Sequence, residues 1–228
     1  MSDINRRLRE LSDKRLLPGS HQDYLFNLKH LNNISPLVIY DIGACVLFWT
    51  NEAKEIWPDA KYYCFEAMPE VEFLFKEANL EGYHLGVLSD INGKEVEFYQ
   101  NTEYPGGNSY YKENIQFNKS VEMFFNDSHK RKYVTKTLDT IVKENNFLLP
   151  DMIKIDVQGA ELDILKGSEK CLSVCKHLIL ELQKVEYNIG APLKDTVIEF
   201  VESKGFKLVN NMPFSDNGPD GDYHFIKI

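Results

Sequence analysis

Polar and acidic side chains stand at four points where the sequence predicts that a buried β-strand ends. They are Asp41 after residues 37–40, Glu66 after residues 61–65, Ser89 with Asp90 after residues 83–88, and Asp156 in residues 152–157. In open α/β folds the carboxyl ends of the strands meet at one edge of the sheet, and ligands bind there. The sequence therefore predicts a ligand site lined by carboxylates, which can accept hydrogen bonds from hydroxyl groups or take up a proton.

The first of these strand ends continues as a turn of small residues, Asp41-Ile42-Gly43-Ala44-Cys45. Small residues let the backbone approach a ligand closely, although a plain strand-to-helix turn with a capping Asp41 is the alternative. Glu66 lies at about the 20-residue offset at which Rossmann-type folds hold ribose hydroxyls. A surface glutamate at a strand end is the competing interpretation.

Lys154 and Asp156 share one strand face in the otherwise apolar segment MIKIDV. A buried lysine and a buried aspartate must pair or titrate, so Asp156 is either a base that orients an acceptor or half of a structural ion pair. Glu181 and His224 are further candidates for a catalytic base. The alternative for Glu181 is a capping role, and the alternative for His224 is a packed position in the core. Asp156 and Glu161 alone are too few ligands to predict a metal site.

Alternating apolar strands and amphipathic helices surround these residues and predict a doubly wound, mostly parallel α/β sheet. The predicted strands are 37–40, 61–65, 83–88, 152–157, 177–182, 206–209 and 223–228, and the predicted helices are 21–31, 51–57, 70–79, 138–145, 160–172 and 193–204. The short loop between the last two strands predicts that they pair antiparallel. Asn92-Gly93 predicts a β-hairpin through residues 90–99.

Composition narrows the class of protein. The chain has 228 residues, 43% hydrophobic and 27% charged, which suits one soluble domain. Its net charge of -9 argues against a nucleic-acid partner. The sequence holds no apolar run long enough for a membrane span and no signal peptide, so we expect a cytoplasmic protein. The four cysteines form no CxxC pair, which argues against a zinc site.

Several segments between Leu37 and Gln183 together resemble the FkbM-type methyltransferases. They are VIYDIGA, CFEAMPE, GVLSDINGKEVEFY, GGNS, VTKTLDTIV, MIKIDVQGAELDILKGSEKCL and HLILELQ. The resemblance implies an S-adenosylmethionine-dependent O-methyltransferase with a seven-stranded α/β sheet, acting on a hydroxyl of a sugar or another small metabolite. The helical pattern before the first strand and the turn signal at Asn92-Gly93 lead us to expect a helical cap over residues 1–36 and a methyltransferase domain over residues 37–228, with an insertion at about residues 90–135.

The resemblance implies a role for each matching residue. Asp41, Gly43 and Ala44 would line the methionyl end of S-adenosylmethionine, Glu66 would hold its ribose, Ser89 and Asp90 would border its adenine, and Asp156 would lie beside the sulfonium and the acceptor. Cys45 and Ala67 complete the expected cofactor-binding set. The sequence departs from the family at Cys45, Leu47, Ala67 and Gln158, where a small polar residue, a glycine, a proline and a glutamate are usual.

Two other functions compete with this one. A nicotinamide-dependent oxidoreductase also uses a strand, a tight turn and a ribose carboxylate, but GxGxxG would need glycines where Cys45 and Phe48 stand. A cofactor-binding module without turnover would account for Leu47 in the cofactor loop. The aromatic segment 99–133 is expected to fold over the acceptor as a lid, or else to pack on the sheet as a plain insertion.

Overall fold

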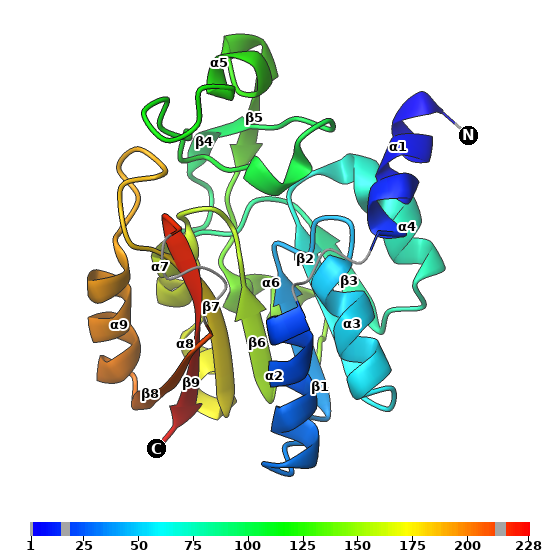
Figure 1. Ribbon diagram of the computed structural model, residues 1–228, viewed down its shortest axis with the longest axis vertical. Helices are drawn as coiled ribbons and strands as arrows, with labels where there is room; N and C mark the ends of the chain where they lie inside the picture. The colour runs from blue at the N-terminus through cyan, green and yellow to red at the C-terminus, as the bar shows by residue number, and fades with distance from the viewer. Residues whose placement is uncertain (1, 15–18, 213–217) are drawn as a thin grey trace.

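The computed structural model describes residues 2–14, 19–212 and 218–228, and seven of its strands form one sheet in the order β3-β2-β1-β6-β7-β9-β8. These strands are β1 (Val38–Ile42), β2 (Lys61–Glu66), β3 (Gly82–Leu85), β6 (Met152–Ile155), β7 (His177–Gln183), β8 (Phe206–Met212) and β9 (Asp220–Lys227). Strands β3, β2, β1, β6 and β7 run parallel, and β9 lies antiparallel between β7 and β8 (Figure 1). The predicted fold class and the antiparallel terminal pair are confirmed.

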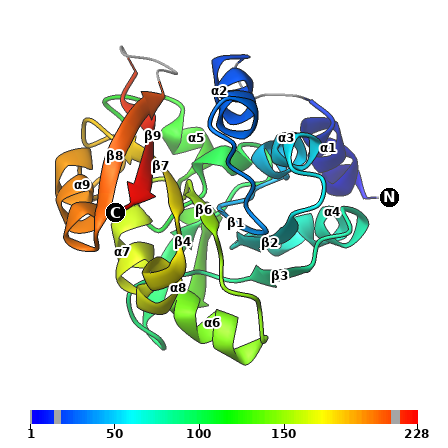
Figure 2. The same ribbon diagram turned by 90° about the horizontal axis from the view of Figure 1, so that it is seen from below.

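Helices cover both faces of the sheet (Figure 2). One face carries α1 (Asp3–Ser12), α2 (Gly19–His30), α3 (Phe48–Ile56) and α4 (Glu72–Glu77); the other carries α6 (Leu138–Glu144), α7 (Glu161–Lys166), α8 (Glu169–Val174) and α9 (Lys194–Ser203). Within the ranges that the structure describes, every helix is too short or too polar to cross a membrane.

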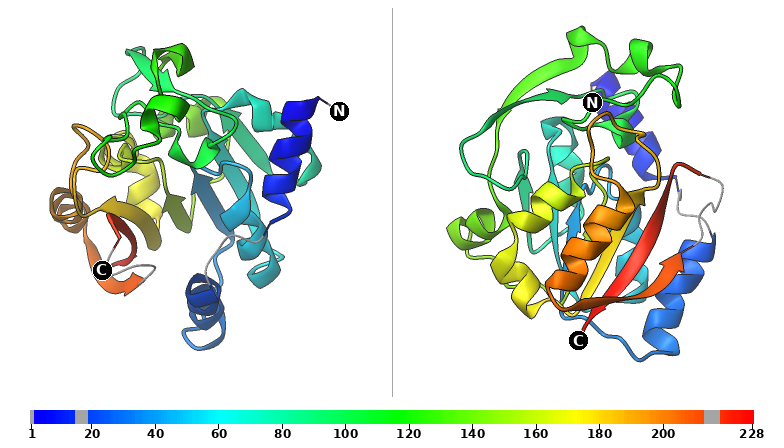
Figure 3. Two further views of the ribbon diagram at one scale, coloured as in Figure 1. Left: turned by 45° about the horizontal axis from the view of Figure 1, so that its top comes forward. Right: turned by 90° about the vertical axis from the view of Figure 1, so that its left-hand side faces the viewer.

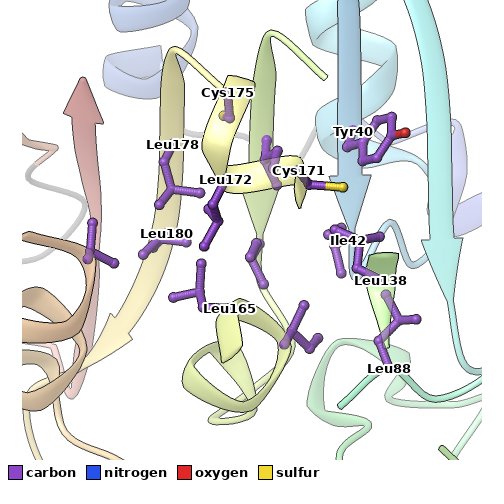
Figure 4. Close-up of a cluster of buried hydrophobic side chains, with 14 of the residues drawn as sticks. Tyr40, Ile42, Leu88, Leu138, Leu165, Cys171, Leu172, Cys175, Leu178 and Leu180 are labelled. Carbon is purple, nitrogen blue, oxygen red and sulfur yellow. The ribbon is translucent and has the colours of Figure 1, made fainter. Parts of the chain in front are cut away.

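The two faces of the sheet bury separate hydrophobic clusters, which is why its central strands read as unbroken apolar runs. Tyr40 and Ile42 of β1 and Leu178 and Leu180 of β7 pack against α6, α7 and α8 (Figure 4). On the opposite face, Ile39, Met152 and Ile179 pack against α2 and α3. Each fully buried aliphatic or aromatic side chain contributes about 1.5–3 kcal/mol, so this double layer holds the strand ends in place.

The predicted hairpin through residues 90–99 is wrong. Strand β4 (Glu95–Tyr99) pairs antiparallel with β5 (Lys130–Val134), far downstream, and the two form a separate ribbon. Asn92 does not close a hairpin: its side chain accepts a hydrogen bond from the Thr137 backbone N–H and donates one to the Thr140 hydroxyl. This turn is therefore fastened to the start of α6. Between β4 and β5 lies an insertion that includes α5 (Val121–Phe124), and Figure 3 shows it at one end of the sheet.

Two other predicted elements differ from the structure. The helix predicted over residues 160–172 is divided into α7 and α8 at Gly167, where an added Cβ would lie 2.3 Å from the carbonyl oxygen of Ser89. The strand predicted over residues 83–88 ends at Leu85, and Leu88 then pairs with Lys136 in an isolated bridge. Both differences arise from contacts with distant segments, which helix and strand periodicity do not reveal.

Candidate functional site

A pocket opens at the carboxyl ends of β1, β2 and β6 and is walled on its outer side by the insertion. Its polar lining includes Asp41, Cys45, Glu66, Asn108, Ser109, Tyr110, Lys154, Asp156 and Gln158, and its apolar lining includes Phe48, Phe65, Val87, Leu88, Phe98 and Ile164. Gly43, Ala44 and Ala67 complete the part contributed by the ends of β1 and β2. The structure thus brings together most of the residues that the sequence singled out.

Gly43 lets the turn after β1 lie directly against the end of β6. Its φ of +80° is a left-handed conformation that glycine adopts freely. A Cβ at Gly43 would stand 1.7 Å from the carbonyl oxygen of Asp156, a distance that no side chain can occupy. The glycine therefore sets the distance between the turn and Asp156.

Glu66 fastens the turn after β1 to the turn after β2. Its Oε2 accepts a hydrogen bond of 2.9 Å from the backbone N–H of Cys45, and its Oε1 accepts bonds from the N–H groups of Ala67 and Met68. Burial nevertheless raises the pKa of this carboxyl group above its usual range. Each carboxylate oxygen can accept two hydrogen bonds, so Oε2 keeps one lone pair for a ligand hydroxyl.

Asp41 is fully buried at the end of β1 and lines the same pocket. Its Oδ2 accepts a 2.5 Å hydrogen bond from the hydroxyl of Thr50, the third residue of α3. Its Oδ1 has no hydrogen-bond partner among the described residues. Burial raises the pKa of Asp41, although the Lys154 charge and the Thr50 hydrogen bond act in the opposite direction. A cation in the pocket would compensate the Asp41 charge.

A row of charged and polar groups crosses the sheet beside Asp41. Lys154 is its neighbour on β6 by register, and the Lys154 Nζ lies 2.7 Å from Asp156 Oδ2, so the predicted pair is confirmed. The Gln158 amide donates to both Asp156 Oδ1, at 3.0 Å, and Glu181 Oε2, at 2.6 Å. Burial opposes ionisation of Asp156, but the Lys154 charge and these hydrogen bonds outweigh it and lower its pKa. Burial and the Asp156 charge instead raise the pKa of Glu181 well above its usual range.

Four residues predicted for the site are not among those that line the pocket: Ser89, Asp90, Glu181 and His224. Ser89 and Asp90 follow the lining residues Val87 and Leu88, and Ser89 is within 3.4 Å of the Tyr110 hydroxyl. His224 lies opposite Ile179 in the β7–β9 pair, remote from the strand ends that form the pocket.

His224 has partners of its own on that side of the sheet. Its Nδ1 is 2.5 Å from the Tyr24 hydroxyl of α2, and its Nε2 is 3.2 Å from His177 Nδ1. Because β9 runs antiparallel to β7, a residue late in β9 faces the amino-terminal half of β7. The structure therefore gives His224 a packing role, and we assign it no part in catalysis.

In the described ranges, no group of three or more His, Cys, Asp or Glu side chains is placed to hold a metal ion. The pocket lining itself supplies carboxylates, the Lys154 ammonium, hydroxyl and amide side chains, and an apolar wall.

Known proteins share both the sequence and the fold of this chain. Residues 41–208 match the family model described as the methyltransferase FkbM domain. The chain belongs to the FkbM methyltransferase family. A protein of Beauveria bassiana (strain ARSEF 2860) called "Methyltransferase 1" is 22% identical over 191 residues, which cover 77% of this chain and 74% of that protein.

Solved structures support the fold. The methyltransferase FkbM of Methylobacillus flagellatus KT aligns with a TM-score of 0.54 at 12% identity, over 96% of this chain and 58% of that one. Magnesium protoporphyrin IX methyltransferase of Synechocystis PCC 6803, solved with bound SAM, aligns with a TM-score of 0.51 at 11% identity, over 100% of this chain and 92% of that one. This FkbM-family chain is therefore a methyltransferase with a Rossmann-like sheet.

Three of the four positions at which the sequence departs from the expected FkbM pattern, Cys45, Leu47 and Gln158, have a positive φ. Leu47, where the family usually has glycine, has φ +69°, and Cys45 and Gln158 have φ +48° and +56°. Residues with a Cβ rarely adopt this left-handed region. Leu47 therefore has a backbone conformation that glycine adopts more easily than leucine.

The sequence predicted that the aromatic segment 99–133 folds over the acceptor or packs on the sheet, but it did not show which residues of this segment line the pocket. The Ser109 hydroxyl donates to the carbonyl of Gln158 at 2.9 Å, and the hydroxyls of Tyr110 and Tyr111 both donate to Asp163 Oδ2 at 2.9 Å. These bonds hold the segment against the end of β6 and the start of α7. The turn-forming sequence PGGNS and its neighbouring aromatic residues marked the segment as a loop but did not show that Ser109 and Tyr110 reach the pocket.

Asp222 lies directly opposite Glu181 in the β7–β9 pair. Its buried carboxyl group leads us to expect that the stability of the fold depends on pH. Burial raises the pKa of Asp222 from 3.8 to about 7. The folded state therefore binds the carboxyl proton of Asp222 more tightly than the unfolded chain does. The contribution of this proton to the free energy of unfolding is lost as the pH rises from about 4 to 7. Asp222→Asn should raise the melting temperature at pH 8, and the gain should shrink toward pH 4. Thermal unfolding followed by circular dichroism across this range measures the effect.

Asp59→Asn is the control, because Asp59 is exposed at a surface turn. It should leave the melting temperature unchanged at every pH. An Asp222→Asn variant that is no more stable than the wild type at pH 8 would contradict the interpretation.

Proposed function

We propose that this protein transfers a methyl group from S-adenosylmethionine to a hydroxyl of a sugar or another small metabolite. The observation that carries the proposal is Asp41 Oδ1, a buried carboxylate oxygen in the pocket without a hydrogen-bond partner among the described residues. The α-ammonium of the cofactor would supply both the hydrogen bond and the positive charge that this oxygen lacks. Membership of a methyltransferase family supports the same cofactor.

The other pocket residues fit the remaining parts of that cofactor. Glu66 Oε2 has a free lone pair for a ribose hydroxyl. Val87, Leu88 and Ile164 offer an apolar surface for the adenine, with Ser89 and Asp90 at its border. Gly43 and Ala44, which carry no large side chain, leave room for the methionyl chain.

When bound, the cofactor supplies a methyl group activated by its sulfonium. Displacement of this kind requires the nucleophile, the methyl carbon and the sulfur to lie in line, so most of the catalysis can come from orientation. We assign this orienting role to Asp156, which is held on both oxygens by Lys154 and Gln158. Its ionised carboxylate can still accept a hydrogen bond from an acceptor hydroxyl, because each oxygen has a second lone pair.

Glu181 is the second acidic group that we place near the acceptor. The Gln158 amide joins it to Asp156, so a proton taken up by either carboxylate changes the charge that the other one faces. The higher pKa of Glu181 makes it the stronger base of the two when ionised.

A thermal-shift series tests the cofactor. S-adenosylmethionine and S-adenosylhomocysteine should each raise the melting temperature, because a ligand at 100 times its dissociation constant adds about 2.7 kcal/mol to the free energy of unfolding. NAD is the control and should give no shift. Stabilisation by NAD alone would refute the proposal in favour of an oxidoreductase. A screen of sugars and hydroxylated metabolites with methyl-labelled donor then identifies the acceptor.

A further inference from the structure

Helix α1 lies outside the segment that matches the family, yet it packs against the loop that forms the floor of the pocket. Leu8, in the middle of α1, is 0% exposed and belongs to one buried cluster with Ala44, Val46 and Leu47 of that loop. The cluster also contains Met68 after β2. In Figure 1, α1 stands beside α4, at the same side of the sheet.

The loop itself needs support at Leu47. This residue is the N-cap of α3, its φ is +69°, and its backbone N–H donates to the Ala44 carbonyl at 2.7 Å, which closes the turn. Glycine adopts such a conformation without strain and leucine does not. The Leu47 side chain is 2% exposed, so its burial opposes the strain of the backbone.

Polar contacts fasten α1 at its two sides. Arg9 pairs with Glu77 of α4, and its guanidinium lies 5.4 Å from the centre of the Phe73 ring. Arg7 pairs with Glu103 of the insertion at 2.6 Å. Exposed ion pairs of this kind contribute little, so the buried Leu8 is the main anchor of the helix.

We propose that α1 supports the cofactor site. In this proposal Leu8 covers Leu47 and keeps the Ala44–Leu47 turn in its left-handed conformation. The turn carries the Cys45 backbone N–H, which orients Glu66 by the 2.9 Å bond to Oε2. Leu8 is thus a positioning residue that acts through Leu47, and the inference rests on the proposed binding of S-adenosylmethionine.

Calorimetric titration with S-adenosylhomocysteine tests the role of Leu8. Leu8→Ala should raise the dissociation constant about tenfold, because the turn loses the side chain that covers it. Ile4→Ala is the matched control: Ile4 lies on the same helix, is 38% exposed, and should leave the dissociation constant unchanged. If Leu8→Ala does not fold, Leu8→Val makes a smaller hole and should raise the constant by a smaller factor.

A double-mutant cycle separates positioning from general stability. Leu47→Gly removes the strain, so in that background Leu8→Ala should change the dissociation constant less than about twofold. Two results would overturn the role of α1: a Leu8→Ala protein that melts earlier but binds as tightly as the wild type, or an equal loss of affinity in both backgrounds. A wild-type protein that binds no S-adenosylhomocysteine would refute the proposed function and this role with it, whereas equal binding by the wild type and Leu8→Ala refutes this role alone.

Discussion

Gly43→Ala is expected to weaken cofactor binding strongly, with a rise of about 100-fold in the dissociation constant for S-adenosylhomocysteine. A Cβ at this position would stand 1.7 Å from the carbonyl oxygen of Asp156, so the turn and the end of β6 must move apart. That movement displaces both walls of the pocket at once, and overpacking of this kind costs about 1–3 kcal/mol, which corresponds to a loss of affinity of up to about 100-fold. Isothermal titration calorimetry measures it.

Gly93→Ala is a closely matched control for this substitution. Gly93 has φ +82°, almost the same as the +80° of Gly43, but an added Cβ there would meet nothing within 4 Å. Both variants therefore carry the same backbone strain of about 1–2 kcal/mol, and only Gly43→Ala carries the collision. Equal affinity of the two variants for S-adenosylhomocysteine would show that Gly43 does not set the width of the pocket.

The sequence predicted the sheet well because its signal is local. Runs such as 37–40 are apolar throughout, since both faces of a central strand are buried, and each is followed by a polar residue at the sheet edge. Asp41, Glu66 and Asp156 could be placed together because the carboxyl ends of parallel strands meet. The structure brings these three side chains to one pocket.

The features that sequence reasoning missed depend on contacts between distant segments. Asn92-Gly93 is a strong local turn signal, but β4 pairs with β5 because the turn is fastened to α6. Tyr110 is held at the pocket by its hydrogen bond to Asp163, and the spacing of residues in the sequence does not predict this contact. His224 was a candidate base because histidine can transfer protons; its place in the antiparallel pair decides which end of the sheet it faces. The strand ends were predictable from local patterns, whereas the pairing of distant segments was not.

Asp156→Asn is expected to lower kcat by about 10²–10⁴, the usual contribution of a positioned acid or base, while S-adenosylhomocysteine still binds. The asparagine keeps the shape of the side chain but loses the charge that can draw an acceptor hydroxyl toward the methyl group. The variant must be compared with one that disturbs the same ion pair, because Lys154 is buried and its pairing with Asp156 also stabilises the fold.

Lys154→Met provides that comparison. It breaks the same 2.7 Å ion pair but leaves the Asp156 carboxylate and its hydrogen bond from Gln158 in place. Both variants should melt earlier than the wild type, since removing one partner of a buried pair leaves the other uncompensated. Only Asp156→Asn removes the carboxylate that we propose contacts the acceptor. Its kcat, measured by transfer of labelled methyl to the acceptor found in the screen, should therefore fall further. If the two variants lose kcat equally, Asp156 contributes through the ion pair alone, and the orienting group must be sought at Glu181, which the Gln158 amide holds beside it.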